Sequence, residues 1–414
     1  MKRCALAALC LLAACDDASV ATGGPADGSS AQADGSSEIA DALPASDEAS
    51  RSPGDATLDV NASDDASIPS GEGDPAPACP GAAEPPSTLS CTGLYADIVG
   101  KTLAAGVRSY QPAIPLWSDG AQKARWIQLP AGTRIDASNP SEWTFPVGTK
   151  VWKEFSRDGR RVETRLFQKI DSGPPPYWVH ATYAWNADES EAFTSGGGDI
   201  TLAADGGTYH IPTFGECEQC HNGRTDHILG FEQISLGLTG AQGLTLSELV
   251  SEGLIAPVPT QTSLTIGDDG TGAAAAALGW IHINCGVTCH NANSTATGYG
   301  AGMLLRLDPA LLDGRQVTIS GFDPLRTTIG VPARSPGWIQ PVQWTRIVPG
   351  DPSDSLLVQL ISNRGTNNAV SGQMPPIATS VVDTTDVAKV VEWVASMPAA
   401  IDGGADGGLD ATSE

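Results

Sequence analysis

The pattern of hydrophobic and polar residues indicates strands in the first half of the chain. "TKVWKEFSRDGRRVETRLFQKI", which begins at Thr149, has two stretches of β-forming residues around Asp158 and Gly159, a pair that suits a tight hairpin turn. "ARWIQLPAGTRI" and "YWVHATYAWN" read as further strands. These runs predict a β-rich N-terminal domain over residues 79–210.

Two segments of the second half have a helical pattern instead. One is "TGAAAAALGWIHINC", which ends at Cys285 and is rich in helix-forming residues. The other is "DTTDVAKVVEWVASMP", which ends at Pro398 and places on one stripe Val387, Val390, Val391 and Val394. We therefore expect a helix in each segment.

The N-terminus has the form of an export signal. Two basic residues precede an apolar run from Ala5 to Ala14, which is too short to span a bilayer, and a small-residue site follows at Cys15. "LLAAC" also resembles the bacterial lipobox, in which the signal is removed and the cysteine is lipidated. We expect residues 1–15 to be a lipoprotein signal peptide and Cys15 to be the anchor; an ordinary secretory signal is the alternative. The lipoprotein would lie on the periplasmic or cell-surface side of a bacterial membrane.

Composition sets the ends of the chain apart from its middle. Residues 16–78 and 399–414 consist largely of small, polar and acidic residues, which cannot bury enough apolar surface to fold. They predict a disordered acidic tether and a disordered tail. Together they supply much of the formal net charge of −25, which argues against nucleic acid as a partner.

The β-rich region also holds six of the ten tryptophans: Trp117, Trp126, Trp143, Trp152, Trp178 and Trp185. Exposed aromatic rings of this kind stack on sugars, which leaves a surface binding module open as a function. Tryptophans in strands are more often part of the core, and that is the interpretation we favour.

Six cysteines concern the folded protein once the signal is removed and Cys15 is set aside. An exported chain enters an oxidising compartment, where spare thiols tend to form disulfides. Cys79 and Cys91 frame the Pro-rich loop "CPGAAEPPSTLSC". We expect a disulfide between them.

The strongest chemical signal is "GECEQCHNGRTDH", which contains Cys217, Cys220 and His221. C-x-x-C-H is the pattern of c-type haem attachment, because two thiols must reach the vinyl groups on one edge of the porphyrin while the adjoining imidazole approaches the iron. A redox dithiol, half of a zinc site and chance are the alternatives. The dithiol lacks its βαβ context, and zinc does not require a histidine directly after the pair.

A second pair occurs in "INCGVTCHNANS", where Cys285 and Cys289 precede His290. Three residues separate these cysteines, one more than in most attachment sites. Gly286 would let the added residue bulge outward. Haem attachment is the interpretation we favour, with a Cys285–Cys289 disulfide or a haem held through a single thioether as alternatives.

The residues after this pair carry a resemblance. "IVPGDPSDSLLVQLI" is followed by "VSGQMPPIATS", with Met374 before two prolines that stiffen a loop, and then by the second predicted helix. This order resembles the class I cytochrome c domain of bacterial multidomain proteins. The resemblance implies that Cys285 and Cys289 form thioethers, that His290 is the proximal iron ligand, and that Met374 is the distal one.

A wider resemblance covers about residues 95–398. "IPLWSDGAQKARWIQLPAGTRID", "EWTFPVGTKVWKEF", "RVETRL" and "IPTFGECEQCHNG" resemble, in this order, a largely uncharacterised family of exported bacterial lipoproteins that pair a β-rich region with two cytochrome-like haem motifs. It implies an α+β protein in which the β-rich domain precedes a mostly α-helical cytochrome c-like domain over residues 211–398. Two haem c groups would be its cofactors.

The ligand opposite His221 stays open at this point. The candidates are His180, His210, His227, His282 and Met303, each of which is more often a surface or core residue than a ligand. A second histidine would give a low-potential relay, and an open position would permit small-ligand chemistry.

Three functions follow from these patterns. The first is electron transfer by a dihaem cytochrome, anchored by its lipid, between a membrane donor or redox protein and an acceptor outside the cytoplasm. The second is a peroxidase-like oxidoreductase, and the third is a non-redox binding module whose cysteines form disulfides or zinc ligands. An electron carrier is favoured over an enzyme, since no nucleophile elbow, phosphate loop, H-E-x-x-H or EF-hand pattern is present and no residue is marked as catalytic.

Overall fold

The computed structural model describes residues 79, 85–202, 207–312, 319–334, 344–365, 370 and 372–399. All of them belong to one compact unit that begins at Pro75. The signal peptide 1–15 with Cys15, the tether 16–78 and nearly all of the tail lie outside the described residues.

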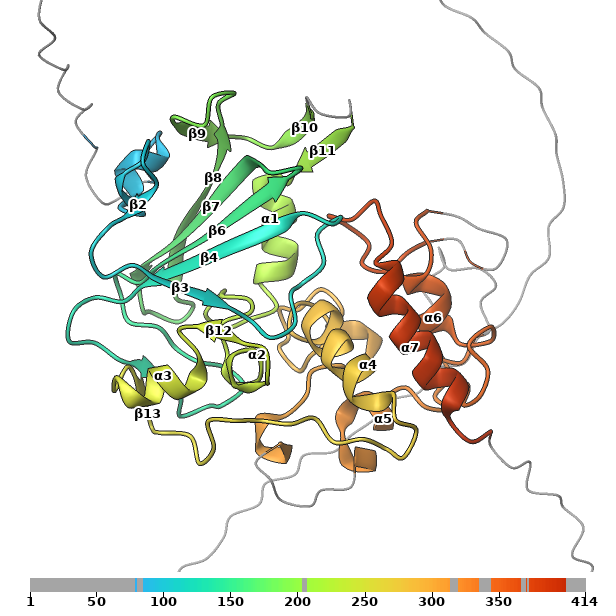
Figure 1. The fold of residues 1–414 in the computed structure, drawn as a ribbon. Helices are drawn as coiled ribbons and strands as arrows, with labels where there is room; N and C mark the ends of the chain where they lie inside the picture. The colour runs from blue at the N-terminus through green and yellow to red at the C-terminus, as the bar shows by residue number, and fades with distance from the viewer. Residues whose placement is uncertain are drawn as a thin grey trace, which may run out of the picture. The chain divides into compact units, whose positions relative to one another are not determined.

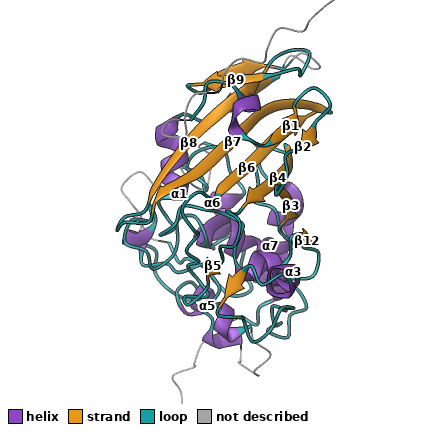
Figure 2. Ribbon diagram, turned by 90° about the vertical axis from the view of Figure 1, so that its left-hand side faces the viewer, coloured by secondary structure: helices purple, strands orange, loops and turns teal. Residues whose placement is uncertain are grey.

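The first half of the described chain forms most of a seven-stranded antiparallel sheet. Its strands lie in the order β12-β3-β4-β6-β7-β8-β9 (Figures 1 and 2). The β-rich N-terminal region is therefore confirmed. The strands are β3 Arg108–Gln111, β4 Gln122–Gln128, β6 Lys150–Arg157, β7 Arg160–Asp171, β8 Tyr177–Trp185, β9 Ala192–Ser195 and β12 Gln242–Gly243.

The predicted hairpin joins β6 to β7. Asp158 and Gly159 have φ angles of 51° and 77°, which matches the turn that two left-handed residues form between antiparallel strands. Successive side chains of β6 point to opposite faces of the sheet, and both faces are buried. Trp152 belongs to one core cluster and Val151 to another. Of the six tryptophans in this region, three are buried and three are half-buried.

Three two-stranded sheets complete the β structure. They pair β1 Tyr95–Asp97 with β2 Thr102–Leu103, β10 Gly198–Thr201 with β11 Thr208–Ile211, and β5 Ile135–Asp136 with β13 Ile255–Ala256. β12 and β13 follow residue 210 in the chain but pair with strands of the first half. The regions before and after residue 210 are thus joined by backbone hydrogen bonds.

The expectation of a mostly α-helical cytochrome c-like domain over residues 211–398 is wrong. The described chain is β-rich, and its α-helices are short apart from the last: α1 Phe214–His221, α2 Gln233–Gly237, α3 Leu246–Ser251, α4 Ala274–Ile281, α5 Asp323–Arg326, α6 Leu356–Ile361 and α7 Thr384–Ser396. Four 3₁₀ turns add Leu89–Thr92, Tyr299–Ala301, Pro309–Leu311 and Ile319–Gly321. The physical reason is composition, since the chain's 47 glycines and 30 prolines interrupt helices repeatedly.

α7 is the helix whose pattern the sequence predicts best. Val387, Val390 and Val394 are buried, and Val391 is half-buried against the same cluster. Each buried valine stabilises the fold by about 1.5–3 kcal/mol. The helix packs on α4, and the indole Nε1 of Trp280 in α4 donates to Asp383 at the N-cap of α7 over 3.0 Å. Figure 1 shows α4, α6 and α7 grouped beside the sheet.

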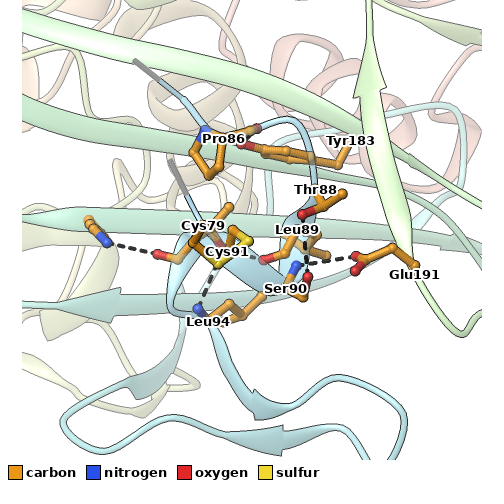
Figure 3. The surroundings of a disulfide bond; sticks show 11 residues. Cys79, Pro86, Thr88, Leu89, Ser90, Cys91, Leu94, Tyr183 and Glu191 are labelled. Atoms are coloured by element: carbon orange, nitrogen blue, oxygen red, sulfur yellow. Dashed lines mark hydrogen bonds between the residues drawn. A yellow bond between two sulfur atoms is a disulfide. The ribbon is translucent and has the colours of Figure 1, made fainter. Parts of the chain in front are cut away.

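Cys79 and Cys91 form the expected disulfide, with 5.2 Å between their Cα atoms (Figure 3). The segment around it is tied to the large sheet. Tyr183 of β8 donates its hydroxyl to the carbonyl of Pro86 over 2.9 Å, and the amide of Ser90 donates to a Glu191 carboxylate oxygen over 3.2 Å. None of the helices in the described part of the chain is long and apolar enough to cross a membrane.

Candidate functional site

The first cysteine motif lies on α1. Thr213 and Glu216 form a capping box that starts the helix. Cys217 and Cys220 follow three residues apart, so both thiols leave neighbouring positions of one helical face. Cys217 is buried and Cys220 is half-buried. Burial raises the pKa of the Cys217 thiol, with Glu163 and Glu216 adding to the effect and Arg165 opposing it.

The geometry around His221 selects one tautomer of its imidazole. Its Nδ1 lies 2.6 Å from the carbonyl oxygen of His227, so Nδ1 must carry the proton and donate. The ring stacks on Phe167 of β7, with 4.2 Å between ring centres. Burial lowers the pKa of His221 to about 3, so the imidazole is neutral at physiological pH. Nε2 is therefore left with a lone pair, the arrangement usual for a metal-binding histidine.

A buried ion pair holds the loop that orients His221. Asp226 precedes His227, and its carboxylate contacts Lys169 Nζ at 2.8 Å, with both side chains almost fully buried. The indole of Trp178 donates to it over 2.9 Å, and the amide of Phe145 over 2.5 Å. These donors fix the carboxylate on the sheet, and with it the carbonyl that His221 contacts.

The second motif begins where α4 widens into a π-helical turn, His282–Gly286. The amide of Val287 donates to His282, and that of His290 to Cys285, each over 2.8 Å and five residues. A π turn accommodates one residue more than an α turn. A Cβ on Gly286 would lie 2.4 Å from backbone atoms of Leu305 and Arg306, so the close approach requires glycine.

One pocket brings the second motif together with the methionine loop. Cys285, Cys289, His290 and Met374 all line it, as does Cys220 of the first motif. The atoms leave about 1040 Å³ of empty space, open solvent included, and the α6 side chains Leu356, Leu357, Leu360 and Ile361 form an apolar wall. A mostly apolar pocket with a few convergent polar groups is the usual form of a cofactor site.

His290 is buried and neutral in this pocket. Burial, together with the nearby Arg346 guanidinium, lowers its pKa to about 4. Its Nδ1 is buried and has no hydrogen-bond partner among the described residues. Gly298 packs against Nδ1, where a Cβ would lie only 2.8 Å away. A neutral imidazole can hold a metal through Nε2, but Nδ1 here lacks the acceptor that orients most metal-binding histidines.

The two motifs lie in contact. The thiols of Cys220 and Cys289 share a hydrogen bond, which raises the pKa of Cys220 and lowers that of Cys289 to about 7. Gly223, just after the first motif, packs on the carbonyl of Thr288 within the second. Cys217 and His221 do not line the pocket that Cys220 shares. Of the two thiols of the first motif, Cys217 thus lies on the side of the sheet, and Cys220 lies on the side of the second motif.

The structure supports neither a disulfide nor a zinc site at these four cysteines. Cys217, Cys220, Cys285 and Cys289 carry no disulfide, so the expected alternative of a Cys285–Cys289 bond is not formed. Within the described ranges, no three side chains of His, Cys, Asp or Glu converge as a metal-binding group. The zinc alternative therefore has no donor cluster among these residues.

Two candidates for the ligand opposite His221 are held by other side chains. His180 stacks on Phe167, the ring on which His221 also stacks. His210 contacts Asp199 at 2.7 Å and Glu216 at 3.2 Å on the surface.

Three further candidates for this ligand either have other hydrogen-bond partners or lie in the pocket of the second motif. His227 offers its carbonyl to His221. His282 accepts from the amide of Leu307 through Nδ1 and approaches Glu232 at 3.5 Å through Nε2. Met303 lines the pocket of the second motif, which makes it an alternative to Met374 there.

The sequence analysis assigned no role in the site to Asp119, Trp117 or Gly223, which contact the motifs or the methionine loop from distant parts of the chain. Single acidic, aromatic or glycine residues have no spacing that predicts such contacts. Comparison with known proteins gave no match to this chain among family models, curated proteins or solved structures.

Proposed function

We propose that this protein is a c-type cytochrome that transfers electrons outside the cytoplasm, with haem attached at Cys285 and Cys289 and a second haem at Cys217 and Cys220. The observation that supports this most is the shared pocket. The two thiols of the second motif, the neutral imidazole of His290 and the thioether of Met374 line it, although Met374 lies far from the motif in sequence. These are the groups that a Met/His haem c requires.

Each side chain has a role in this proposal. The Cys285 and Cys289 thiols would hold the haem through thioethers, and His290 and Met374 would supply the ligands to its iron. The haem, when bound, supplies a reversible one-electron change at its iron. The leucines of α6 would give the haem an apolar surrounding, and a thioether ligand in an apolar pocket favours a high reduction potential.

The first motif would hold the second haem through Cys217 and Cys220, with His221 as ligand. Its support is the tautomer, because the hydrogen bond to His227 frees Nε2. The contact between Cys220 and Cys289 would bring the attachment edges of the two groups close together. Two haems held in this way could exchange electrons within one protein.

The cellular setting belongs to the same proposal. A lipid on Cys15 anchors the chain to a membrane, on its periplasmic or cell-surface side, and the acidic tether lets the folded part reach a redox partner. The partner is a protein or a membrane electron donor.

Absorption spectra of the exported protein test the proposal. The protein is produced with haem-maturation machinery, and oxidised and reduced spectra are recorded for the unaltered chain, Met374→Ala and Met303→Ala. We expect a Soret band with low-spin iron, loss of the band from methionine sulfur to ferric iron in Met374→Ala, and its retention in Met303→Ala. Both methionines line the pocket, so the pair is matched.

Loss of the band in Met303→Ala alone would assign the distal ligand to Met303 instead. A protein without any Soret band would refute the proposed function.

A further inference from the structure

A tight turn between β3 and β4 reaches from the sheet toward the methionine loop. Asp119 and Gly120 both have positive φ angles, 48° and 75°. A left-handed conformation is uncommon for a non-glycine residue and often marks a functional position. The turn is fixed to the sheet, since Arg157 of β6 donates to the Asp119 carbonyl over 2.5 Å and Lys123 of β4 donates to the Leu116 carbonyl over 2.8 Å.

The Asp119 carboxylate accepts three hydrogen bonds from the segment that follows Met374. The hydroxyl of Thr379 and the amide of Val381 donate to Oδ1 over 2.8 and 3.0 Å. The amide of Ser380 donates to Oδ2 over 2.8 Å. Hydrogen bonds to a charged acceptor are stronger than those between neutral groups.

Trp117 links the same turn to both parts of the pocket. Its indole Nε1 donates to the Val381 carbonyl over 2.8 Å, and its amide donates to the Asn284 side chain over 2.7 Å. Asn284 directly precedes Cys285. The turn thus contacts the start of the second motif on one side and the methionine loop on the other.

The opposite side of the methionine loop is held by α6 and the residues after it. The amide of Met374 donates to the Leu360 carbonyl over 2.9 Å. Arg364 donates to the carbonyl of Met374 and to the hydroxyl of Thr379, each over 3.3 Å. The hydroxyl of Thr379 therefore has hydrogen bonds to both Arg364 and Asp119, and Thr379 is buried.

We propose that Asp119 and Trp117 are positioning residues that hold the Met374 loop over the second motif, so that the thioether reaches the iron. This inference rests on the proposed function, because the ligand role of Met374 belongs to it. The β-rich region then has a defined role, since it braces the distal ligand from a rigid sheet.

The test uses Asp119→Asn with a matched control. An asparagine keeps one accepting oxygen and places an NH₂ group where the other oxygen was. The hydrogen bonds that this second oxygen accepted from the segment after Met374 are then lost. Asp351→Asn is the control, since Asp351 accepts from the same donor types, the hydroxyl and amide of Ser353 and the amide of Asp354. All of those donors belong to its own loop, which does not line the pocket.

The first readout is hydrogen–deuterium exchange of the full-length protein, which needs no haem. We expect the amides of Ser380 and Val381 to exchange at least tenfold faster in Asp119→Asn and unchanged in Asp351→Asn. Unchanged exchange in Asp119→Asn would overturn the proposal.

The second readout is the haem itself. We expect Asp119→Asn to retain covalent haem, to lose much of the band from methionine sulfur to ferric iron, and to have a lower reduction potential. A band and potential equal to those of the unaltered protein, or equally changed in Asp351→Asn, would overturn the positioning role alone. Absence of covalent haem from the unaltered protein would overturn the proposed function, and the ligand role with it.

Discussion

The thiols of Cys220 and Cys289 lie within hydrogen-bond contact, although they belong to two different motifs. The contact joins α1, which packs on the sheet, to the loop that follows the π-helical turn. It makes the two motifs neighbours in space, although Cys217 and His221 do not line the pocket of the second motif.

This contact predicts a specific cross-link in haem-free protein. Mild oxidation with a disulfide reagent, which takes up two electrons as both thiols lose their protons, should join Cys220 to Cys289. Peptide mapping by mass spectrometry identifies the pair. Preferential formation of Cys217–Cys220 or Cys285–Cys289 would contradict the contact.

Gly223 supports the same contact, and its replacement by alanine should destabilise the fold. The added Cβ would lie 1.6 Å from the carbonyl oxygen of Thr288, so backbone must shift. Overpacking of this kind costs about 1–3 kcal/mol, measured as the free energy of unfolding in urea.

Gly215→Ala is the control for that variant. Gly215 lies within α1, and an added Cβ would meet no atom within 4 Å, so alanine should be neutral or stabilise by about 0.5–1 kcal/mol. Equal losses in the two variants would mean that the packing at Thr288 is not the cause.

Removal of the buried carboxylate in Asp226→Ala should destabilise strongly. The substitution leaves Lys169 charged and unpaired in the interior, which costs about 3–5 kcal/mol. Urea unfolding measures the loss, and Glu252→Gln serves as the comparison because its partner Arg108 is well exposed. The surface variant should lose far less stability, because solvent screens an exposed ion pair; a comparable loss in both would argue against a buried pair.

Stability should also depend on pH through His210. Its hydrogen bond to Asp199 raises the pKa of His210, so its contribution is complete below about pH 6.5 and is lost as the pH rises through the raised pKa. The pKa of Glu216 is lowered, chiefly by the backbone hydrogen bond from Thr213, so its contribution is complete above about pH 4.3 and is lost on acidification.

The surface position limits the size of this effect. The His210 side chain is 38% exposed, so solvent screening holds the contribution to about 0.5 kcal/mol. Urea unfolding across pH should show it, with His210→Gln removing the decline on the alkaline side. The same alkaline decline in the variant would assign it to another group.

The sequence predicted local structure far better than long-range contacts. The Asp158–Gly159 turn, the valine stripe of α7 and the short disulfide loop each follow from neighbouring residues. Helical content after residue 211 was overestimated, because a resemblance in motif order does not determine how many residues glycine and proline leave to each helix.

The site shows the same limit. Met374 was expected at the second motif, and it does line that pocket. The hydrogen bonds of Asp119 to Ser380 and Val381 join parts of the chain that no periodicity connects. β12 and β13 have two residues each, too few for any alternating pattern.

The intact mass of the denatured protein tests the central claim most directly, because only covalent haem survives denaturation. The protein is exported with haem-maturation machinery and compared with Cys217→Ser/Cys220→Ser and Cys285→Ser/Cys289→Ser variants. The account predicts two haems on the unaltered chain and one on each variant. A chain that carries no haem would contradict it.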